Sequence, residues 1–197
     1  MTAALAGLVA GFVHVLSGPD HLAAVAPYAV DGKQRAWRTG IRWGLGHGVG
    51  VLGAALLAFA LRHALPLEAL STWAERCVGL VLIGIGLRGM RGALAEQQPH
   101  VHGQAVFAVG TVHGLAGSSH LLGILPALAL PSDLAAAAYL LLFGAGSIAA
   151  MGTFLSLVGW LAERPRLSHV AARSALLRLC SLAAIAVGGW WLLASPG

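Results

Sequence analysis

Charged residues are scarce in this chain. Only 10% of its 197 residues are charged and 58% are hydrophobic, whereas a soluble domain carries about 25% charged residues. The 12 Lys and Arg and 7 Asp and Glu residues are too few to cover a water-soluble surface. The apolar blocks between them are long enough for membrane-spanning helices, which need about 20 apolar residues. The composition therefore excludes a water-soluble enzyme and predicts an integral membrane protein.

Cysteine is also rare. Cys77 and Cys180 both lie in apolar stretches and form no CxxC pair, which argues against a disulfide framework and a thiolate metal site. The net charge is +5, but the basic residues lie in short loops without interleaved aromatic residues. They indicate membrane topology rather than a nucleic-acid partner. The first apolar segment follows no basic region, so we expect it not to be a cleaved signal peptide.

Charged residues, prolines and polar runs divide the chain into six predicted helical spans. They cover approximately residues 3–30, 40–62, 69–88, 104–130, 134–161 and 172–194. Most basic residues fall on one side of these spans: Lys33, Arg35, Arg38, Arg42, Arg88, Arg91, Arg164, Arg166, Arg173 and Arg178. Only Arg62 and Arg76 fall on the other side. By the positive-inside rule the basic side is cytoplasmic, and both termini are predicted to lie outside the cytoplasm.

An internal repeat divides the chain in two. Residues 11–27 (GFVHVLSGPDHLAAVAP) and 110–126 (GTVHGLAGSSHLLGILP) are identical at eight of 17 positions at an offset of 99. Each half, approximately 1–98 and 99–197, holds three spans, so the second copy enters the membrane from the opposite face. We therefore predict an all-α polytopic membrane protein. It is a single transmembrane domain over 1–197, with six transmembrane helices in a 3+3 inverted repeat and with helices 1 and 4 interrupted, a plan typical of transporters.

Ionisable residues inside the spans identify the candidate site. Asp20 is the only acid well inside a span, where it costs at least about 2.5 kcal/mol and so marks a function. His14 and His21 lie seven residues apart, about 10.5 Å along an ideal helix, which is too far for easy sharing of one ion. Gly18 and Pro19 break a helix, so we predict two half-helices. Gly18 would cap the second, with Asp20 in its first turn and His14 brought closer.

The predicted metal-ligating residues combine one carboxylate with several imidazoles. They are His14, Asp20, His21, His47, His113 and His120. This set suits Ni, Co, Zn, Cu or Fe and suits Mg or Ca poorly. His47 is expected to be a fourth ligand or a partner of the ligands. The second half lacks the acid, so His113 and His120 are expected to transfer the ion or to form an exit gate.

Two further groups of residues are assigned to packing. Trp43, Trp73, Trp160, Trp190 and Trp191 lie near span ends and are predicted to anchor the helices at the membrane interface. Gly44, Gly46, Gly48 and Gly50 lie inside a span without a preceding strand or a following Lys-Ser/Thr. They are predicted to allow close helix packing rather than to bind phosphate.

Three stretches resemble the nickel/cobalt transporter superfamily, in particular its urease-accessory-type nickel permeases. They are HVLSGPDHLAAVAP, WGLGHGVG and VHGLAGSSHLLGILP, and the resemblance covers nearly the whole chain. The superfamily's motif of a His followed after a short gap by Asp-His corresponds to His14, Asp20 and His21. Five residues separate His14 from Asp20 here, where the best-known permeases have four. The resemblance implies recognition of Ni²⁺ or Co²⁺ at these residues.

These features predict a permease and not an enzyme. We expect uptake of Ni²⁺ or Co²⁺ as transported substrate through the inner (plasma) membrane, with no permanently bound cofactor. The partners are the metal ion and the lipid bilayer, and a homo-oligomer is left open. One alternative is a b-type haem protein, since two spans each carry two His seven apart, although haem has no need of Asp20. The other is an intramembrane metallohydrolase, although the chain lacks HExxH and a second acid to act as base.

Overall fold

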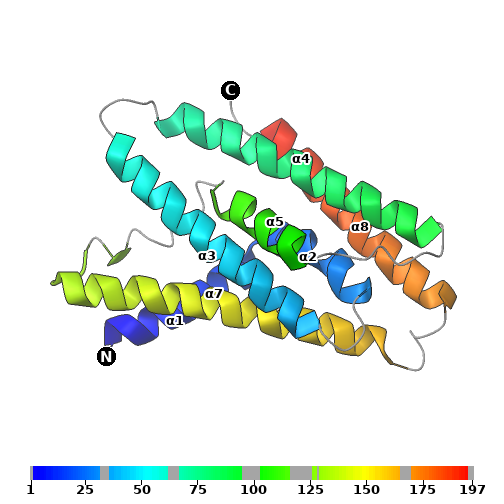
Figure 1. Ribbon diagram of the computed structural model, residues 1–197, viewed down its shortest axis with the longest axis horizontal. Helices are drawn as coiled ribbons and strands as arrows, with labels where there is room; N and C mark the ends of the chain where they lie inside the picture. Colours follow the sequence, from blue (N-terminus) through cyan, green and yellow to red (C-terminus); the bar gives the residue numbers. More distant parts are fainter. Residues whose placement is uncertain are drawn as a thin grey trace.

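Helices make up the regular structure of the part of the chain that the structure describes. The computed structural model describes residues 2–31, 36–61, 67–94, 103–115, 126–127, 129–164 and 170–194. Its helices are α1 (Thr2–Ser17), α2 (Pro19–Asp31), α3 (Ala36–Leu61), α4 (Leu67–Leu94), α5 (Gly103–Leu115), α7 (Asp133–Ala162) and α8 (Val170–Ala194) (Figure 1). The predicted all-α class is confirmed.

The first predicted span is broken where the sequence predicts it. Helix α1 ends at Ser17, α2 begins at Pro19, and their axes differ by 73°. Pro19 has no backbone N–H to continue the first helix, but its fixed φ suits the first position of the second. The amide of Leu22 donates to the Gly18 carbonyl (3.3 Å), which is the first hydrogen bond of α2. Gly18 therefore caps α2 as predicted.

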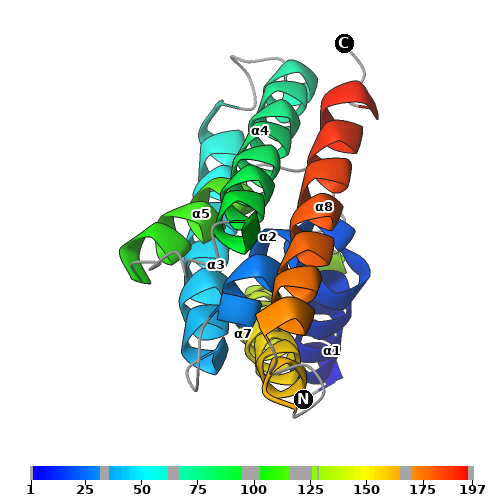
Figure 2. The same cartoon turned by 90° about the vertical axis from the view of Figure 1, so that its right-hand side faces the viewer.

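Helix α2 lies at the centre of the helical assembly. It contacts α1, α3, α4, α7 and α8, and Figure 2 shows it surrounded by longer helices. From Asp20 to Ala29 its side chains are buried except for Leu22 and Tyr28, which are partly exposed. A helix that is apolar on nearly every side is stable only inside a larger protein. The half-helix that carries Asp20 and His21 is therefore part of the core.

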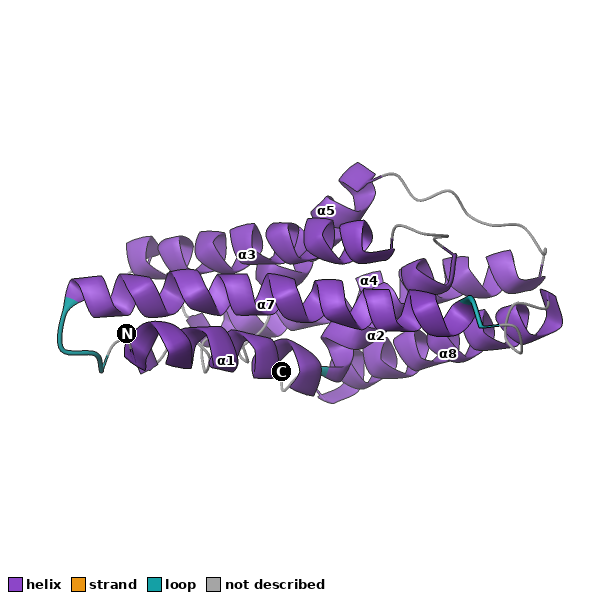
Figure 3. Ribbon diagram, turned by 90° about the horizontal axis from the view of Figure 1, so that it is seen from below, coloured by secondary structure: helices purple, strands orange, loops and turns teal. Residues whose placement is uncertain are grey.

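The other helices pack against one another in pairs. Helix α1 lies along α7 (Figure 3), α5 packs against α3, α4 against α8, and α3 against α7. Glycines on these helices meet the backbone of the partner helix. A Cβ on Gly11 would overlap the Phe143 carbonyl, and a Cβ on Gly110 would overlap the Trp43 carbonyl. Small residues let helix backbones approach closely, which is the usual basis of packing between membrane helices.

The glycine-rich stretch of α3 follows the same rule. Added Cβ atoms on Gly46 and Gly50 would overlap the carbonyls of Phe107 and Thr111 on α5, and one on Gly44 would contact Ile148 on α7. The prediction of close helix packing is confirmed for these three glycines. Gly48 has open space at the Cβ position, so it does not share this role.

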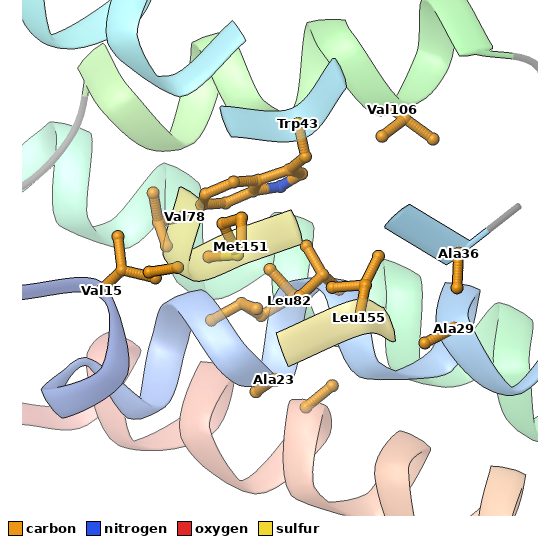
Figure 4. Packing of buried hydrophobic residues seen from close by; sticks show 14 residues of the cluster. Val15, Ala23, Ala29, Ala36, Trp43, Val78, Leu82, Val106, Met151 and Leu155 are labelled. Atoms are coloured by element: carbon orange, nitrogen blue, oxygen red, sulfur yellow. The ribbon is translucent and has the colours of Figure 1, made fainter. Parts of the chain in front are cut away.

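Apolar side chains lie both inside and outside the assembly. The core includes Val15, Leu82, Met151 and Leu155, which come from three different helices (Figure 4). Many large apolar side chains also point outward, for example Leu193, which is 89% exposed. An outer surface of this kind is compatible with lipid and unfavourable in water.

Three helical segments are long and apolar enough to cross a membrane, within the residues that the structure describes. They are Arg76–Leu94, Asp133–Ala162 and Ala171–Leu193, and the broken pair of α1 and α2 adds a fourth if it counts as one span. Several helices thus have the length and composition of membrane spans. The full set of six spans and the inverted-repeat layout stay predictions.

Candidate metal centre

Five of the six predicted site residues lie together where the half-helices meet. His14 lies near the end of α1, and Asp20 and His21 occupy the first turn of α2. His47 comes from the middle of α3 and His113 from the end of α5. All of these side chains are buried except His14, which is partly exposed. Four helices therefore supply the polar side chains of one internal cluster.

Asp20 lies between two imidazoles. His21 donates through Nδ1 to Asp20 Oδ1 and His113 donates through Nε2 to Asp20 Oδ2, both at 3.1 Å. The carboxylate also lies in the first turn of α2, where the helix dipole favours negative charge. His113 is 93 positions away from Asp20 in the sequence. The two halves of the chain therefore meet at this carboxylate.

His21 is the centre of the histidine cluster. Its ring centroid lies 4.9 Å from that of His14, 5.0 Å from His47 and 4.8 Å from His113. Potential ligand atoms fall into two groups of three, each with all its atoms within 4.8 Å of one another. We call His14, His21 and His47 the imidazole triad, and Asp20, His21 and His113 the carboxylate triad.

The spacing of these atoms suits a small divalent ion. Two ligand atoms bound at right angles at about 2.1 Å from one ion lie about 3.0 Å apart. The oxygens of Asp20 lie 3.1 Å from their nitrogen partners on His21 and His113. Nitrogen and carboxylate oxygen together favour first-row transition ions over Mg²⁺ or Ca²⁺. Each triad, whose potential ligand atoms lie within 4.8 Å of one another, is therefore close to the dimensions of such a site.

The break between α1 and α2 shapes this site. The Ser17 hydroxyl donates to the His14 carbonyl (3.1 Å), which satisfies an acceptor at the end of α1. At Gly18 a Cβ would overlap Nδ1 of His21 and would lie 3.0 Å from Asp20 Oδ1. Gly18 therefore leaves room for the close approach of the two side chains that follow it, those of His21 and Asp20.

Trp43 belongs to the site and is not an interfacial anchor. It is fully buried (0% exposed), and its ring stacks on His47 at 5.0 Å with an interplanar angle of 9°. It also lies 5.9 Å from the ring of His21 and 5.3 Å from that of His113. The prediction for Trp43 was wrong because position along a span does not show which helix face is covered. Its spacing of four residues before His47 was the available signal, since such residues share a helix face.

A cavity of about 390 Å³ between α3 and α7 reaches the cluster. Its lining includes His47 and Gly48 on α3, and Phe143 and Ser147 on α7. The Ser147 hydroxyl donates to the Phe143 carbonyl (2.9 Å). Through this cavity, a small solute could reach His47 from the side of α3 and α7.

His120 lies outside the described residues. The same holds for the second half's counterpart of the Gly18-Pro19 break, because residues 116–125 are not described. The predicted role of His120 and the interruption of helix 4 therefore stay predictions.

Comparison with known proteins finds two chloroplast relatives in Arabidopsis thaliana. They are Chloroplast protein FOR GROWTH AND FERTILITY 1, 37% identical, and Chloroplast protein FOR GROWTH AND FERTILITY 2, 38% identical. Each match covers 95% of this chain but only 58% and 55% of the relative. The chain thus spans a little over half the length of these two proteins.

A third relative comes from a bacterium. Urease accessory protein UreH of Bacillus sp. (strain TB-90) is 28% identical over 78% of this chain and 74% of its own length. The chain is a distant homologue of this protein. The match supports the resemblance to urease-accessory proteins at a coarse level. No family model and no solved structure matches the chain.

Proposed function

We propose that this protein carries a divalent transition-metal ion across a membrane, with Ni²⁺ as the main substrate and Co²⁺ as a second. The observation that carries the proposal is the buried cluster of His14, Asp20, His21, His47 and His113 within an assembly of apolar helices. We further propose uptake as the direction, because the permease branch that the sequence resembles is an uptake branch.

The energetic cost of Asp20 supports a functional role. An acid at membrane depth costs at least about 2.5 kcal/mol on insertion scales. Hydrogen bonds between membrane helices contribute only about 0.6 kcal/mol on average. The two bonds that Asp20 accepts from His21 and His113 therefore do not offset its cost as structural contacts alone. Binding of a cation by the Asp20 carboxylate would offset the remaining cost of placing it in the membrane.

Two observations, the sequence motif and the name of one relative, support nickel among the transition metals that the donor set allows. The donor set of imidazole and carboxylate suits Ni²⁺ and Co²⁺, as it also suits Zn²⁺. The motif of His14, Asp20 and His21 resembles that of nickel permeases, and one relative is named as a urease accessory protein. The names of the chloroplast relatives mention growth and fertility and no metal.

The proposed inverted repeat explains how a central site could open to each side of the membrane in turn. Gly11 on α1 corresponds to Gly110 on α5 at an offset of 99, and Trp43 on α3 corresponds to Phe143 on α7 at an offset of 100. A Cβ on Gly11 would overlap the Phe143 carbonyl, and one on Gly110 would overlap the Trp43 carbonyl. These matching contacts support an assembly in which two similar halves face each other. Rocking of one half against the other would expose a central site to each side in turn.

The packing of the site favours metal-ion transport over the two alternatives, a b-type haem protein and a metallohydrolase. A b-type haem requires a flat slot between two axial imidazoles, whereas the rings of His14, His47 and His113 pack closely around His21. A metallohydrolase needs a general base beside its metal. Asp20 is the only acid in the described cluster, and it already contacts two of the histidines.

The sequence and the relatives together suggest which cellular membrane holds the protein. The sequence predicts a bacterial inner membrane, and the names of two relatives point to a chloroplast membrane. We propose one of these two locations, with both termini on the non-cytoplasmic or equivalent side. The metal ion and the lipid are the proposed partners.

Transport into proteoliposomes tests the proposed function. Purified protein is reconstituted with a metal-sensitive dye inside, and Ni²⁺, Co²⁺, Zn²⁺ or Mg²⁺ is added outside. We expect Ni²⁺ and Co²⁺ flux in the unaltered protein, none for Mg²⁺, and a loss of at least about tenfold in Asp20→Asn. Ser156→Ala, which removes an exposed hydroxyl elsewhere on α7 and no ligand, should transport normally. Equal flux in the Asp20→Asn protein would refute the proposal.

A further inference from the structure

His21 is shared by the two groups of potential ligand atoms. The imidazole triad contains His14, His21 and His47, and the carboxylate triad contains Asp20, His21 and His113. An imidazole has one nitrogen on each of two edges. Nδ1 of His21 faces Asp20, and Nε2 lies on the far edge of the same ring. One ring can therefore serve an ion on either side, with its single ring proton moving to the nitrogen that is not bound to the ion.

The two triads differ in access. His14 is partly exposed, so the imidazole triad has a member that the surroundings of the protein can reach. All three members of the carboxylate triad are buried, with Asp20 6% exposed and His113 2% exposed. The ion thus meets the imidazole triad at a more accessible position and the carboxylate triad at an enclosed one.

The triads also differ in charge. The imidazole triad offers three neutral nitrogens, whereas the carboxylate triad includes the negative charge of Asp20. Attraction between opposite charges is strengthened by burial. A divalent ion is therefore held more tightly in the carboxylate triad. The imidazole triad suits an ion in passage, because it provides ligands without a deep energy minimum.

His14 and His113 are equivalent residues of the repeated sequence, each near the end of its own helix, α1 or α5. Each triad contains one of this pair, and both rings lie at nearly the same distance from His21, 4.9 and 4.8 Å between centroids. In an inverted repeat these helices enter from opposite faces of the membrane. Each triad then holds one of the two residues whose helices enter from opposite faces.

We propose that the protein holds its ion at two alternative positions, the imidazole triad and the carboxylate triad, and passes it from one to the other with His21 as the common ligand. This inference rests on the proposed transport function and specifies its path. Only one position is filled at a time, because two divalent ions sharing one imidazole would repel each other strongly. His14 and His113 act at different stages of the passage.

Binding and transport measured side by side test the two positions. Ni²⁺ binding is measured by equilibrium dialysis of the purified full chain, and Ni²⁺ flux is measured in proteoliposomes. His14→Ala leaves the tighter carboxylate triad intact, so its affinity should stay within about threefold of the unaltered protein. Its flux should fall by at least about tenfold, because the ion can no longer pass through the accessible position.

The other variants complete the pattern. His21→Ala removes the common ligand and should lower the affinity by about 100-fold. His113→Ala should keep the weaker binding of the imidazole triad, and the double variant His14→Ala/His113→Ala should lose it. Ser156→Ala, which removes an exposed hydroxyl elsewhere on α7, is the control and should bind and transport normally. If His14→Ala fails to fold, His14→Gln replaces it and is interpreted in the same way.

Two results would overturn parts of the account, and they are distinguishable. If His14→Ala loses as much affinity as His21→Ala, all the histidines hold one ion at one position and the two-position proposal is wrong, while transport stands. If the unaltered protein neither binds nor transports Ni²⁺, Co²⁺ or Zn²⁺, the proposed function itself fails.

Discussion

At the residue scale, Gly18 controls the shape of the ligand cluster. A methyl group at this position would overlap Nδ1 of His21 and lie against Asp20. We expect Gly18→Ala to displace both side chains and to lower Ni²⁺ affinity by about tenfold or more, the range found when a metal ligand is misoriented. Equilibrium dialysis of the purified variant measures this loss.

Gly48→Ala is the matched control for Gly18→Ala. Its added methyl group meets no atom within 4 Å, although the residue is next to His47 in the sequence. This control should bind Ni²⁺ like the unaltered protein. Normal binding by Gly18→Ala would show that His21 does not approach the helix break closely or that it is not a ligand.

Trp43 should report directly on the ion. Its indole stacks on His47 and lies close to His21 and His113. An open-shell ion bound among these rings should quench its fluorescence at short range. We expect Ni²⁺ to quench part of the tryptophan emission, and we expect that part to be missing in Trp43→Phe.

The control for Trp43→Phe uses a tryptophan elsewhere in the core. Trp191 on α8 is partly buried against the main apolar cluster. Trp191→Phe should retain the quenching by Ni²⁺. Quenching that survives Trp43→Phe and disappears in Trp191→Phe would place the ion away from the histidine cluster.

At the element scale, two glycines on α7 distinguish the effect of helix packing from the effect of intrinsic helix propensity. On α7, a Cβ on Gly146 would overlap the Leu8 carbonyl of α1, whereas one on Gly144 meets nothing within 4 Å. Overpacking of a close contact costs about 1–3 kcal/mol. We therefore expect Gly146→Ala to lower the free energy of unfolding by about this amount and to reduce Tm in detergent.

Gly144→Ala serves as the comparison within the same helix. Replacing a helical Gly by Ala without a clash stabilises by about 0.5–1 kcal/mol, because the unfolded chain loses freedom. This variant should therefore match or exceed the Tm of the unaltered protein. Equal effects of the two substitutions would argue against the close packing of α1 on α7.

The sequence predicted those features of the fold that depend on local chemistry. The break between α1 and α2 follows from the missing amide of Pro19. The all-α class follows from long apolar runs. Which helices pack together could not be predicted, because amphipathic patterns show a buried face and not its partner. The contacts of α3 with both α5 and α7 needed the structure.

The candidate site was predictable to a similar extent. His14, Asp20 and His21 stand out as ionisable residues close in sequence and inside an apolar stretch. The hydrogen bond from His113 to Asp20 joins residues 93 positions apart, and no local pattern encodes such a contact. The sequence placed His113 with a transfer or exit role, and the structure places it in direct contact with the acid.

At the scale of the whole molecule, polarity is inverted relative to a soluble protein. Within the described residues, the buried polar side chains are Asp20, His21, His47, His113, Ser147 and Ser181. Apolar side chains cover much of the outside, including Leu134 at 82% exposed and Leu141 at 72% exposed. A polar site inside an apolar shell suits a protein that holds a hydrophilic substrate within a membrane.

The X-ray absorption spectrum of bound Ni²⁺ at the nickel K-edge tests the central claim most directly, since it reports the ligands around the ion. Purified protein with one equivalent of Ni²⁺ should show nitrogen and oxygen ligands with the outer-shell scattering of at least two imidazoles. In His21→Ala this imidazole scattering should be lost. A spectrum of water and oxygen ligands alone, or one unchanged by His21→Ala, would contradict a nickel site at the meeting point of α1, α2, α3 and α5.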